Sequence, residues 1–401
     1  MNTWGFINSF GVFQAYYTTS LNRPPADISW IGSFQIFLLF FIGALTGRLT
    51  DAGYFRPVFM FGTVLQLLGI FASSFADGSY WQIFLAQGVC QGLGNGFLFC
   101  PSMAIASTYF SKKRSLAIGI VACGSATGGL VFPSVARQML PTVGFAWTMR
   151  TIGFLQLATL VACNVFLKPR MAPRRSGPWL DLDAFKEWEY TFYLLGSFAV
   201  SSIRAFRLLR GETDDVLQCY LGVFFGFYYI ASYSRNVIGM GYADSLNLLL
   251  VLNGMGLPGR LLPNHLADRF GPITVFIPTT IIAGACILSW MAVKSATGLY
   301  IWAVFYGMAA GGIQSLFPAG LSSLTPDLRK AGIRLGMAFS INSFATLVGP
   351  PIAGAIITSS GGSYQGAQVY AGVLMLVGTV FMVAAKLARI RRVKGNWKTK
   401  V

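Results

Sequence analysis

Long apolar segments recur along the whole chain, and they restrict the fold more than any other feature. Of the 401 residues, 54% are hydrophobic and only 11% are charged, whereas soluble domains usually carry about 25% charge. An apolar segment of roughly 18 residues or more is long enough to cross a bilayer as a helix. We therefore predict an all-α membrane protein, because no soluble core needs so many such segments.

The apolar segments predict twelve transmembrane helices in two halves. Residues 1–167 form the N-terminal six-helix bundle and residues 190–388 the C-terminal one. Between them, residues 168–189 contain three prolines and several basic residues, so we expect a cytoplasmic linker there. A basic cytoplasmic tail, residues 389–401, ends the chain. The expected helices are residues 2–17, 29–47, 57–75, 81–108, 115–139, 145–167, 190–234, 245–266, 272–293, 299–324, 335–358 and 369–388.

The net charge of +17 comes mainly from Lys and Arg residues that lie in alternate loops. This bias is typical of the cytoplasmic loops of membrane proteins, so the expected partner is a lipid bilayer and not nucleic acid. The six cysteines are scattered, mostly inside apolar segments and without a CxxC pair. They predict neither a disulfide framework nor a zinc site.

Two of the expected helices are irregular. The first is short, which leads us to expect a truncated N-terminus. The seventh is interrupted by Val200–Gln218, which holds three Arg and three acidic residues, and such charges are costly in a bilayer. Without this segment the flanks join into one helix of about 25 residues. Because Val-Ser and Gln can be encoded by typical intron ends, we interpret residues 200–218 as a retained intron. A genuine re-entrant or cytoplasmic insertion is the alternative.

A short charged turn occurs at matching places in the two halves. The first copy is Gly47-Arg48-Leu49-Thr50-Asp51, followed by Arg56, and the second copy lies within Asn264–Gly271. Glycine lets two helices approach closely, and an acid and a base can hold neighbouring helices together. We therefore predict gating roles, rather than substrate contacts, for Gly47, Asp51, Arg56, Asp268 and Arg269. Ordinary positive charge beside a membrane helix is the alternative.

This repeated turn resembles the loop signature of the major facilitator superfamily, whose two halves are parallel repeats. Tyr109–Ala117, with Lys112, Lys113 and Arg114 as a basic cluster, resembles the start of the fifth helix in the monocarboxylate porter family, in its fungal branch. Trp4–Phe13 is similar to the end of that family's first helix. The resemblance covers essentially the whole chain. It implies a twelve-helix secondary transporter and adds the basic cluster to the gating residues.

Two positions depart from the animal lactate carriers of that family. Those carriers have a Lys where this chain has Asn8, and an Asp four residues before a conserved Arg. Here Arg260 matches the Arg, but Gly256 stands in place of the Asp. Two parts of the lactate machinery are therefore missing, and lactate is not the expected substrate.

Arg260 is the first candidate for a substrate ligand. It lies in the eighth helix among apolar neighbours, and an intramembrane Arg normally faces the protein interior or a water-filled cavity. It can bind an anionic substrate, or it can hold a neighbouring helix in place. Arg150 is a second candidate, with an interfacial anchor as the alternative. Further polar candidates, which equally suit hydrogen bonds between helices, are Asn8, Gln14, Gln35, Gln87, Gln91, Asn95, Asn253, Gln314 and Asn342. The aromatic run Phe224–Tyr229 suits a cavity for rings or contact with lipid.

The sequence contains no catalytic constellation, metal cluster or nucleotide-binding loop. We therefore predict neither an enzyme nor a cofactor. The expected function is secondary active transport, in which two bundles rock around a central site, with export of a small organic acid or secondary metabolite. The resemblance implies proton coupling. Import of a monocarboxylate or vitamin-like nutrient is one alternative, and an inactive or sensor-like membrane protein is another. We expect a monomer, in the plasma membrane or else in a vacuolar or other organelle membrane.

Overall fold

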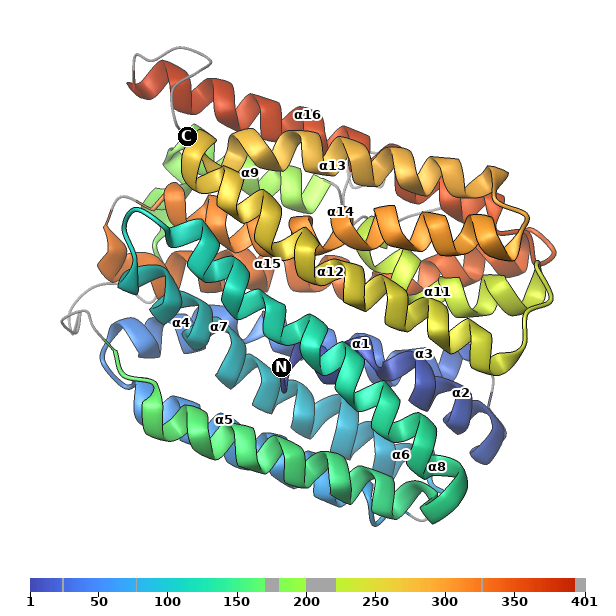
Figure 1. Ribbon diagram of the computed structural model, residues 1–401. Coiled ribbons are helices and arrows are strands. Elements are labelled where there is room, and N and C mark those ends of the chain that lie inside the picture. Colours follow the sequence, from blue (N-terminus) through green and yellow to red (C-terminus); the bar gives the residue numbers. More distant parts are fainter. Residues whose placement is uncertain (24, 77, 170–179, 200–220, 326, 394–401) are drawn as a thin grey trace, which may run out of the picture. The chain divides into compact units, whose positions relative to one another are not determined.

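The computed structural model describes residues 1–23, 25–76, 78–169, 180–199, 221–325 and 327–393 (Figure 1). The regular elements within these ranges are all helical, as predicted. The suspected insert, residues 200–218, lies outside them. The chain divides into two compact units. The first comprises Met1–Asp181 and Thr325–Ser343, and the second comprises Leu182–Leu324 and Phe344–Val401.

The first unit is built mainly from helices of the first half of the chain. They are α1 (Trp4–Asn8), α2 (Phe10–Ser20), α3 (Pro25–Phe41), α4 (Gly43–Asp51), α5 (Phe55–Ser73), α6 (Tyr80–Ile83), the π-helix η1 (Phe84–Cys90), α7 (Gln91–Tyr109) and α8 (Arg114–Phe166). The 3₁₀ helix η4 (Leu328–Lys330) and the beginning of α15 (Ala331–Ser359) also belong to this unit.

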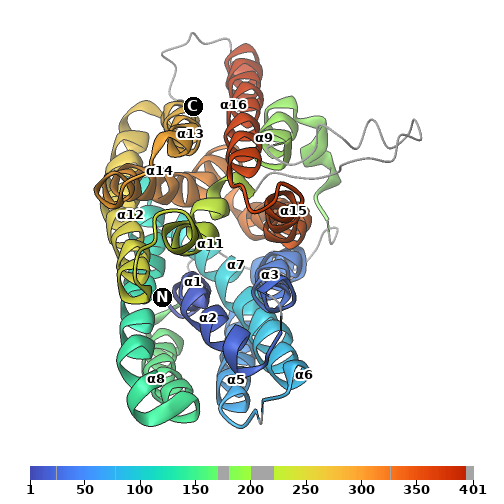
Figure 2. The same cartoon turned by 90° about the vertical axis from the view of Figure 1, so that its right-hand side faces the viewer.

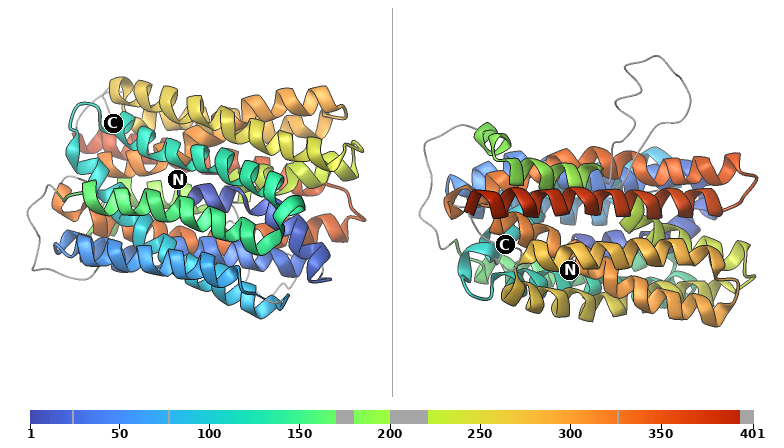
Figure 3. Two further views of the ribbon diagram at one scale, coloured as in Figure 1. Left: turned by 60° about the horizontal axis from the view of Figure 1, so that its bottom comes forward. Right: turned by 90° about the horizontal axis from the view of Figure 1, so that it is seen from above.

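Helix α8, with 53 residues, consists of two limbs that meet at a kink. At Gly144 the backbone has φ 78° and ψ 177°, a conformation that only glycine adopts at low cost. The ribbon turns back on itself there (Figures 1 and 3). The limbs, residues 114–143 and 145–166, correspond to the fifth and sixth expected helices.

The second unit contains the helices of the second half. They are the 3₁₀ helix η2 (Leu182–Lys186), α9 (Trp188–Ala199), α11 (Leu221–Asn236), α12 (Tyr242–Phe270), α13 (Pro272–Ser289), the 3₁₀ helix η3 (Trp290–Ala292), α14 (Ala296–Ser323), the rest of α15, and α16 (Gln365–Val393). Helices α9 and α16 pack side by side (Figure 2). Helix α16 includes the first residues of the expected tail, up to Val393.

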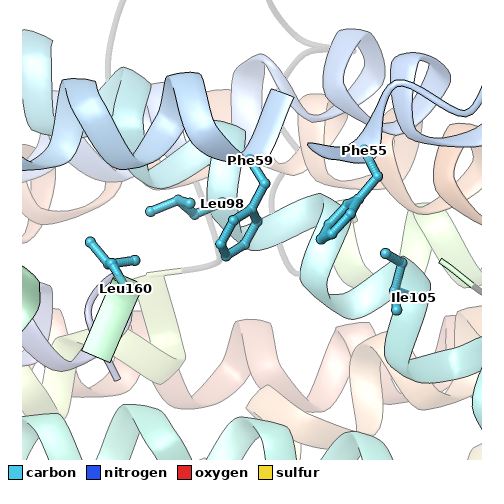
Figure 4. Packing of buried hydrophobic residues seen from close by; sticks show 5 residues of the cluster. All are labelled: Phe55, Phe59, Leu98, Ile105 and Leu160. Atoms are coloured by element: carbon cyan, nitrogen blue, oxygen red, sulfur yellow. The ribbon is translucent and has the colours of Figure 1, made fainter. Parts of the chain in front are cut away.

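A cluster of buried side chains packs three helices of the first unit together (Figure 4). Phe55 and Phe59 come from α5, Leu98 and Ile105 from α7, and Leu160 from the second limb of α8. Lipid tails are as apolar as these side chains, so within a bilayer the cluster stabilises the unit through close van der Waals packing.

Eight helices of the described residues are long and apolar enough to cross a membrane. The difference from twelve has identifiable causes. Helix α8 counts once although it has two limbs, and the first expected helix is divided into the short α1 and α2. Helices α9 and α11 are counted separately, because residues 200–220 between them lie outside the described ranges. Helix α12 is not among the eight, and its apolar residues are interrupted by Asn247, Asn253 and Arg260. Twelve membrane-spanning helices therefore stay a prediction.

Candidate functional site

Asp51, a predicted gating residue, caps the N-terminus of another helix. Its Oδ1 accepts a hydrogen bond from the backbone N–H of Gly332 (3.0 Å), and its Oδ2 accepts one from Ile333 (2.8 Å). These donors lie in the first turn of α15, where backbone N–H groups have no partner within the helix. The carboxylate also faces the positive end of the helix dipole. A single side chain of α4 therefore holds the start of α15.

Glycines bring the two backbones into contact beside this cap. A Cβ atom on Gly47 would lie 2.0 Å from the carbonyl oxygen of Gly332, and one on Gly336 would lie 2.0 Å from that of Gly43. Any side chain at these positions would push the helices apart. We refer to Gly43, Gly47, Asp51, Gly332 and Gly336 together as the α4–α15 seam. Gly47 thus lies at a close contact between two helices, and its gating role stays a prediction.

The thiol of Cys100 lies against the same seam. It comes from α7 and is fully buried, with its Sγ 3.5 Å from the carbonyl oxygen of Gly43 and 3.9 Å from that of Gly332. Because it contacts both α4 and α15, its accessibility depends on whether these two helices remain together.

The other predicted gating residues lie at helix ends. Arg114 donates from Nε to the carbonyl oxygen of Phe110 (3.3 Å). In the second copy of the turn, Asp268 is half-buried, and the Arg269 guanidinium lies 5.5 Å from the centre of the Phe270 ring. Four of these residues are exposed, namely Arg56, Lys112, Lys113 and Arg269. Their roles stay predictions.

Asp181, at the end of the linker, forms a buried ion pair that we did not predict. Its Oδ1 is 2.9 Å from Lys330 Nζ and its Oδ2 is 2.9 Å from Arg334 Nε, and the residue is only 2% exposed. Burial acts to raise the pKa of Asp181, but the hydrogen bonds and charges of Lys330 and Arg334 outweigh it, so the pKa is lowered. The linker is thereby tied to the beginning of α15.

Replacing Asp181 with Asn should destabilise the protein by about 2 kcal/mol at neutral pH, because two cations lose their shared partner. Since the folded-state pKa lies below the usual value of 3.8, this stabilisation is fully present above the unfolded-state pKa. It is lost as pH falls through the folded-state pKa. Denaturation midpoints in detergent should therefore differ by a constant amount from pH 8 to about pH 5 and converge in stronger acid. A difference that persists there would contradict this assignment.

Arg260 lies in the interior of the second unit. It is 1% exposed, and its Nη2 donates to Oε1 of Gln314 on α14 at 2.5 Å. One turn later on α12, Asn264 donates from Nδ2 to the carbonyl oxygen of Arg260 (2.7 Å) and to Oγ of Ser315 (2.6 Å). The structure thus brings together two predicted substrate ligands, Arg260 and Gln314. It adds Asn264 and Ser315, which the sequence analysis did not single out.

Gly256 determines the space beside this guanidinium. A Cβ atom on Gly256 would lie 2.4 Å from Nη1 of Arg260. The Arg260 side chain therefore reaches the position where the lactate carriers have an acid. The hydrogen bond to the uncharged Gln314 orients the guanidinium.

The remaining amide candidates are buried, apart from Gln14, which is half-buried. Asn253 donates to the carbonyl oxygen of Leu249 in its own helix (3.0 Å), and Gln14 donates to Oγ of Ser29 (3.0 Å). The side chains that are less than a tenth exposed are Asn8, Gln35, Gln87, Gln91, Asn95, Asn253 and Asn342.

Arg150 is held near the end of α5. Its Nε lies 3.3 Å from Oγ of Ser74, and its guanidinium lies 4.9 Å from the Phe75 ring centre and 5.1 Å from that of Trp147. Cation–π contacts of this kind are typical of an anchored Arg. The geometry favours the anchor over a substrate ligand.

Aromatic residues of α11 pack inside the second unit. Phe225 and Phe227 are 2% and 7% exposed, and the Phe225 ring centre lies 5.4 Å from Trp290 and 5.2 Å from Tyr229. Burial of this kind argues against lipid contact for Phe225 and Phe227. The side chain of Phe224 lies outside the described residues.

The comparisons with known proteins decide the family. The sequence profile of the Major Facilitator Superfamily matches residues 1–326 and 258–400. The chain belongs to this superfamily. An MFS-type transporter of Gibberella zeae is 53% identical over 393 residues, covering 98% of this chain and 85% of the relative. The agnestins efflux protein AgnL12 of Paecilomyces divaricatus is 34% identical (96% and 84% covered). The aspyridones efflux protein apdF of Emericella nidulans is 32% identical (96% and 75% covered).

Solved structures of the superfamily share the fold. The human organic anion transporter MFSD10 matches with a TM-score of 0.72 at 13% identity, covering 95% of this chain and 97% of that one. The Escherichia coli fucose:proton symporter FucP matches with 0.67 at 14% identity, covering 96% and 97%. The protein is therefore a multi-pass membrane transporter of small molecules and not an enzyme. The superfamily is confirmed, whereas the monocarboxylate-porter branch stays a prediction.

Proposed function

We propose that this superfamily member is a twelve-helix secondary transporter that exports a small organic acid or an acidic secondary metabolite. The buried guanidinium of Arg260, oriented by the uncharged Gln314, carries the proposal. An Arg within a membrane-spanning helix usually marks a substrate or ion pathway, and a guanidinium is suited to bind the acidic group of a substrate. The efflux names of the relatives support export as the direction.

In the proposed cycle the two bundles alternate around the substrate, as in related folds, and the α4–α15 seam forms in one of the alternating conformations. The Asp51 cap stabilises that conformation without touching substrate. The monocarboxylate-porter resemblance supports proton coupling as part of the proposal. We place the transporter in the plasma membrane as a monomer.

Deleting the gene should raise the intracellular amount of the acidic metabolites that the cell produces and lower their amount in the medium. Mass spectrometry of cells and medium checks this, with re-expressed wild-type protein as the positive control. Higher amounts in the medium and lower amounts in the cell would indicate import instead.

Sequencing the spliced transcript across the codons for Gly196 to Phe225 determines whether to express the form with or without residues 200–218.

A further inference from the structure

Four fully buried amides lie close to one another in the first unit. We call Gln35 of α3, Gln87 of η1, and Gln91 and Asn95 of α7 the amide cluster; each is 0% exposed. Gln35 donates from Nε2 to Oε1 of Gln91 (3.2 Å). The hydroxyl of Tyr17, also fully buried, donates to Oε1 of Gln87 (2.7 Å).

These two hydrogen bonds leave much of the cluster unsatisfied. Among the residues that the structure describes, the atoms without a partner are Gln35 Oε1, Gln87 Nε2, Gln91 Nε2 and both polar atoms of Asn95. Buried polar groups are nearly always paired, because an unpaired one loses its hydrogen bonds to water. Five such atoms on adjacent helices can therefore exchange hydrogen bonds with a bound molecule.

The backbone around the cluster is closely packed. A Cβ atom on Gly69 of α5 would lie 2.5 Å from Cγ of Gln91, and one on Gly92 would lie 3.1 Å from Cα of Gln35. Gln87 lies in the π-helix Phe84–Cys90, a rare conformation that occurs frequently at functional sites. The amides are thus held by tight helix contacts, which is how a binding site is kept in place.

The chemistry of the cluster suits uncharged groups. Amides and a phenol donate and accept hydrogen bonds without a formal charge, and Asn95 offers both functions at one position. We propose that the amide cluster binds the carbonyl and hydroxyl groups of the exported acid. The substrate class is then an oxygenated acid, such as a hydroxylated aromatic acid, and not a simple monocarboxylate. This inference rests on the proposed function, the export of an acid.

Asn95→Leu tests the inference, with 2,4-dihydroxybenzoate and benzoate as probes in proteoliposomes. The wild-type protein should transport the dihydroxy acid about tenfold faster than benzoate, since each hydrogen bond to a neutral group contributes roughly this factor. Asn95→Leu should bring the ratio close to one while benzoate transport continues. The melting temperature of the variant without ligand should equal or exceed that of the wild type, because an unpaired amide is replaced by an apolar side chain of similar size.

Asn164→Leu is the control, because Asn164 is an amide of the same unit that already donates to Oγ1 of Thr63 (2.9 Å) and to the carbonyl oxygen of Leu160 (2.8 Å). It should leave the ratio unchanged. The inference is overturned if the wild type does not prefer the dihydroxy acid, or if the preference survives Asn95→Leu, since the cluster then binds only water. If 2,4-dihydroxybenzoate raises the melting temperature of the wild type but not of Asn95→Leu, while neither acid is transported, the proposed function fails and the binding site stands.

Discussion

Gly256→Asp should lower the transport of acids by about as much as Arg260→Gln. A Cβ atom at position 256 would lie 2.4 Å from Nη1 of Arg260, so a carboxylate there would pair directly with the guanidinium. In the low dielectric of the interior this internal pair would compete with the acidic group of the substrate. Hydrogen bonds to a charged group contribute about 1.5–3 kcal/mol, so transport should fall roughly tenfold to hundredfold. Initial rates in proteoliposomes, normalised to the amount of folded protein, measure it.

Gly256→Ala separates the charge from the added volume. It introduces the same Cβ atom, and the contact it makes is with the flexible end of Arg260, which can move slightly. Acid transport by Gly256→Ala should remain within about threefold of the wild type, because the guanidinium keeps its charge. Arg150→Gln is a second control, since Ser74, Phe75 and Trp147 hold that side chain. If Gly256→Asp transports acids normally, Arg260 has a structural role only.

The helices of this protein were largely predictable because each one must bury about 20 apolar residues in a bilayer. The expected helix 272–293 corresponds to Pro272–Ser289 with the 3₁₀ turn that follows, and the expected helix 299–324 to Ala296–Ser323. The division of the first expected helix was not predictable, because apolarity continues through the break between α1 and α2 at Ser9. The π-helix Phe84–Cys90 also has no sequence signal, since its residues equally suit an ordinary helix.

The candidate site was predictable in part. A lone Arg inside an apolar helix is conspicuous, so Arg260 was found. Gln314 was one of the polar candidates, but its hydrogen bond to Arg260 was not predicted. The partners of Asp51 could not be found in this way, because they are backbone N–H groups, which every residue other than proline carries. The pairing of Asp181 with Lys330 and Arg334 was also missed. It joins residues about 150 positions apart, and charged residues near a membrane surface have many possible partners.

Asp51→Asn should open the α4–α15 seam and expose Cys100. The carboxylate accepts two backbone hydrogen bonds at the N-terminus of α15, and charge-assisted bonds of this kind are about twice as strong as neutral ones. A loss of about 2 kcal/mol would shift the conformational equilibrium roughly 30-fold. A membrane-permeant maleimide should then label Cys100 correspondingly faster, in a protein whose other five cysteines are replaced by Ser. Transport should fall about tenfold, because one conformation of the cycle is less populated.

Asp327→Asn is the control for loss of an acid near the same helix. Asp327 caps the neighbouring η4 through the backbone N–H of Arg329 (3.0 Å) and is exposed on the surface, so its loss should change neither labelling nor transport. The fully buried thiol of Cys100 contacts carbonyl groups of both α4 and α15, so its labelling reports separation of these two helices. If Cys100 is labelled slowly in Asp51→Asn and transport is lost, Asp51 contacts the substrate. If Cys100 is labelled fast and transport is normal, opening of the α4–α15 seam does not limit the transport cycle.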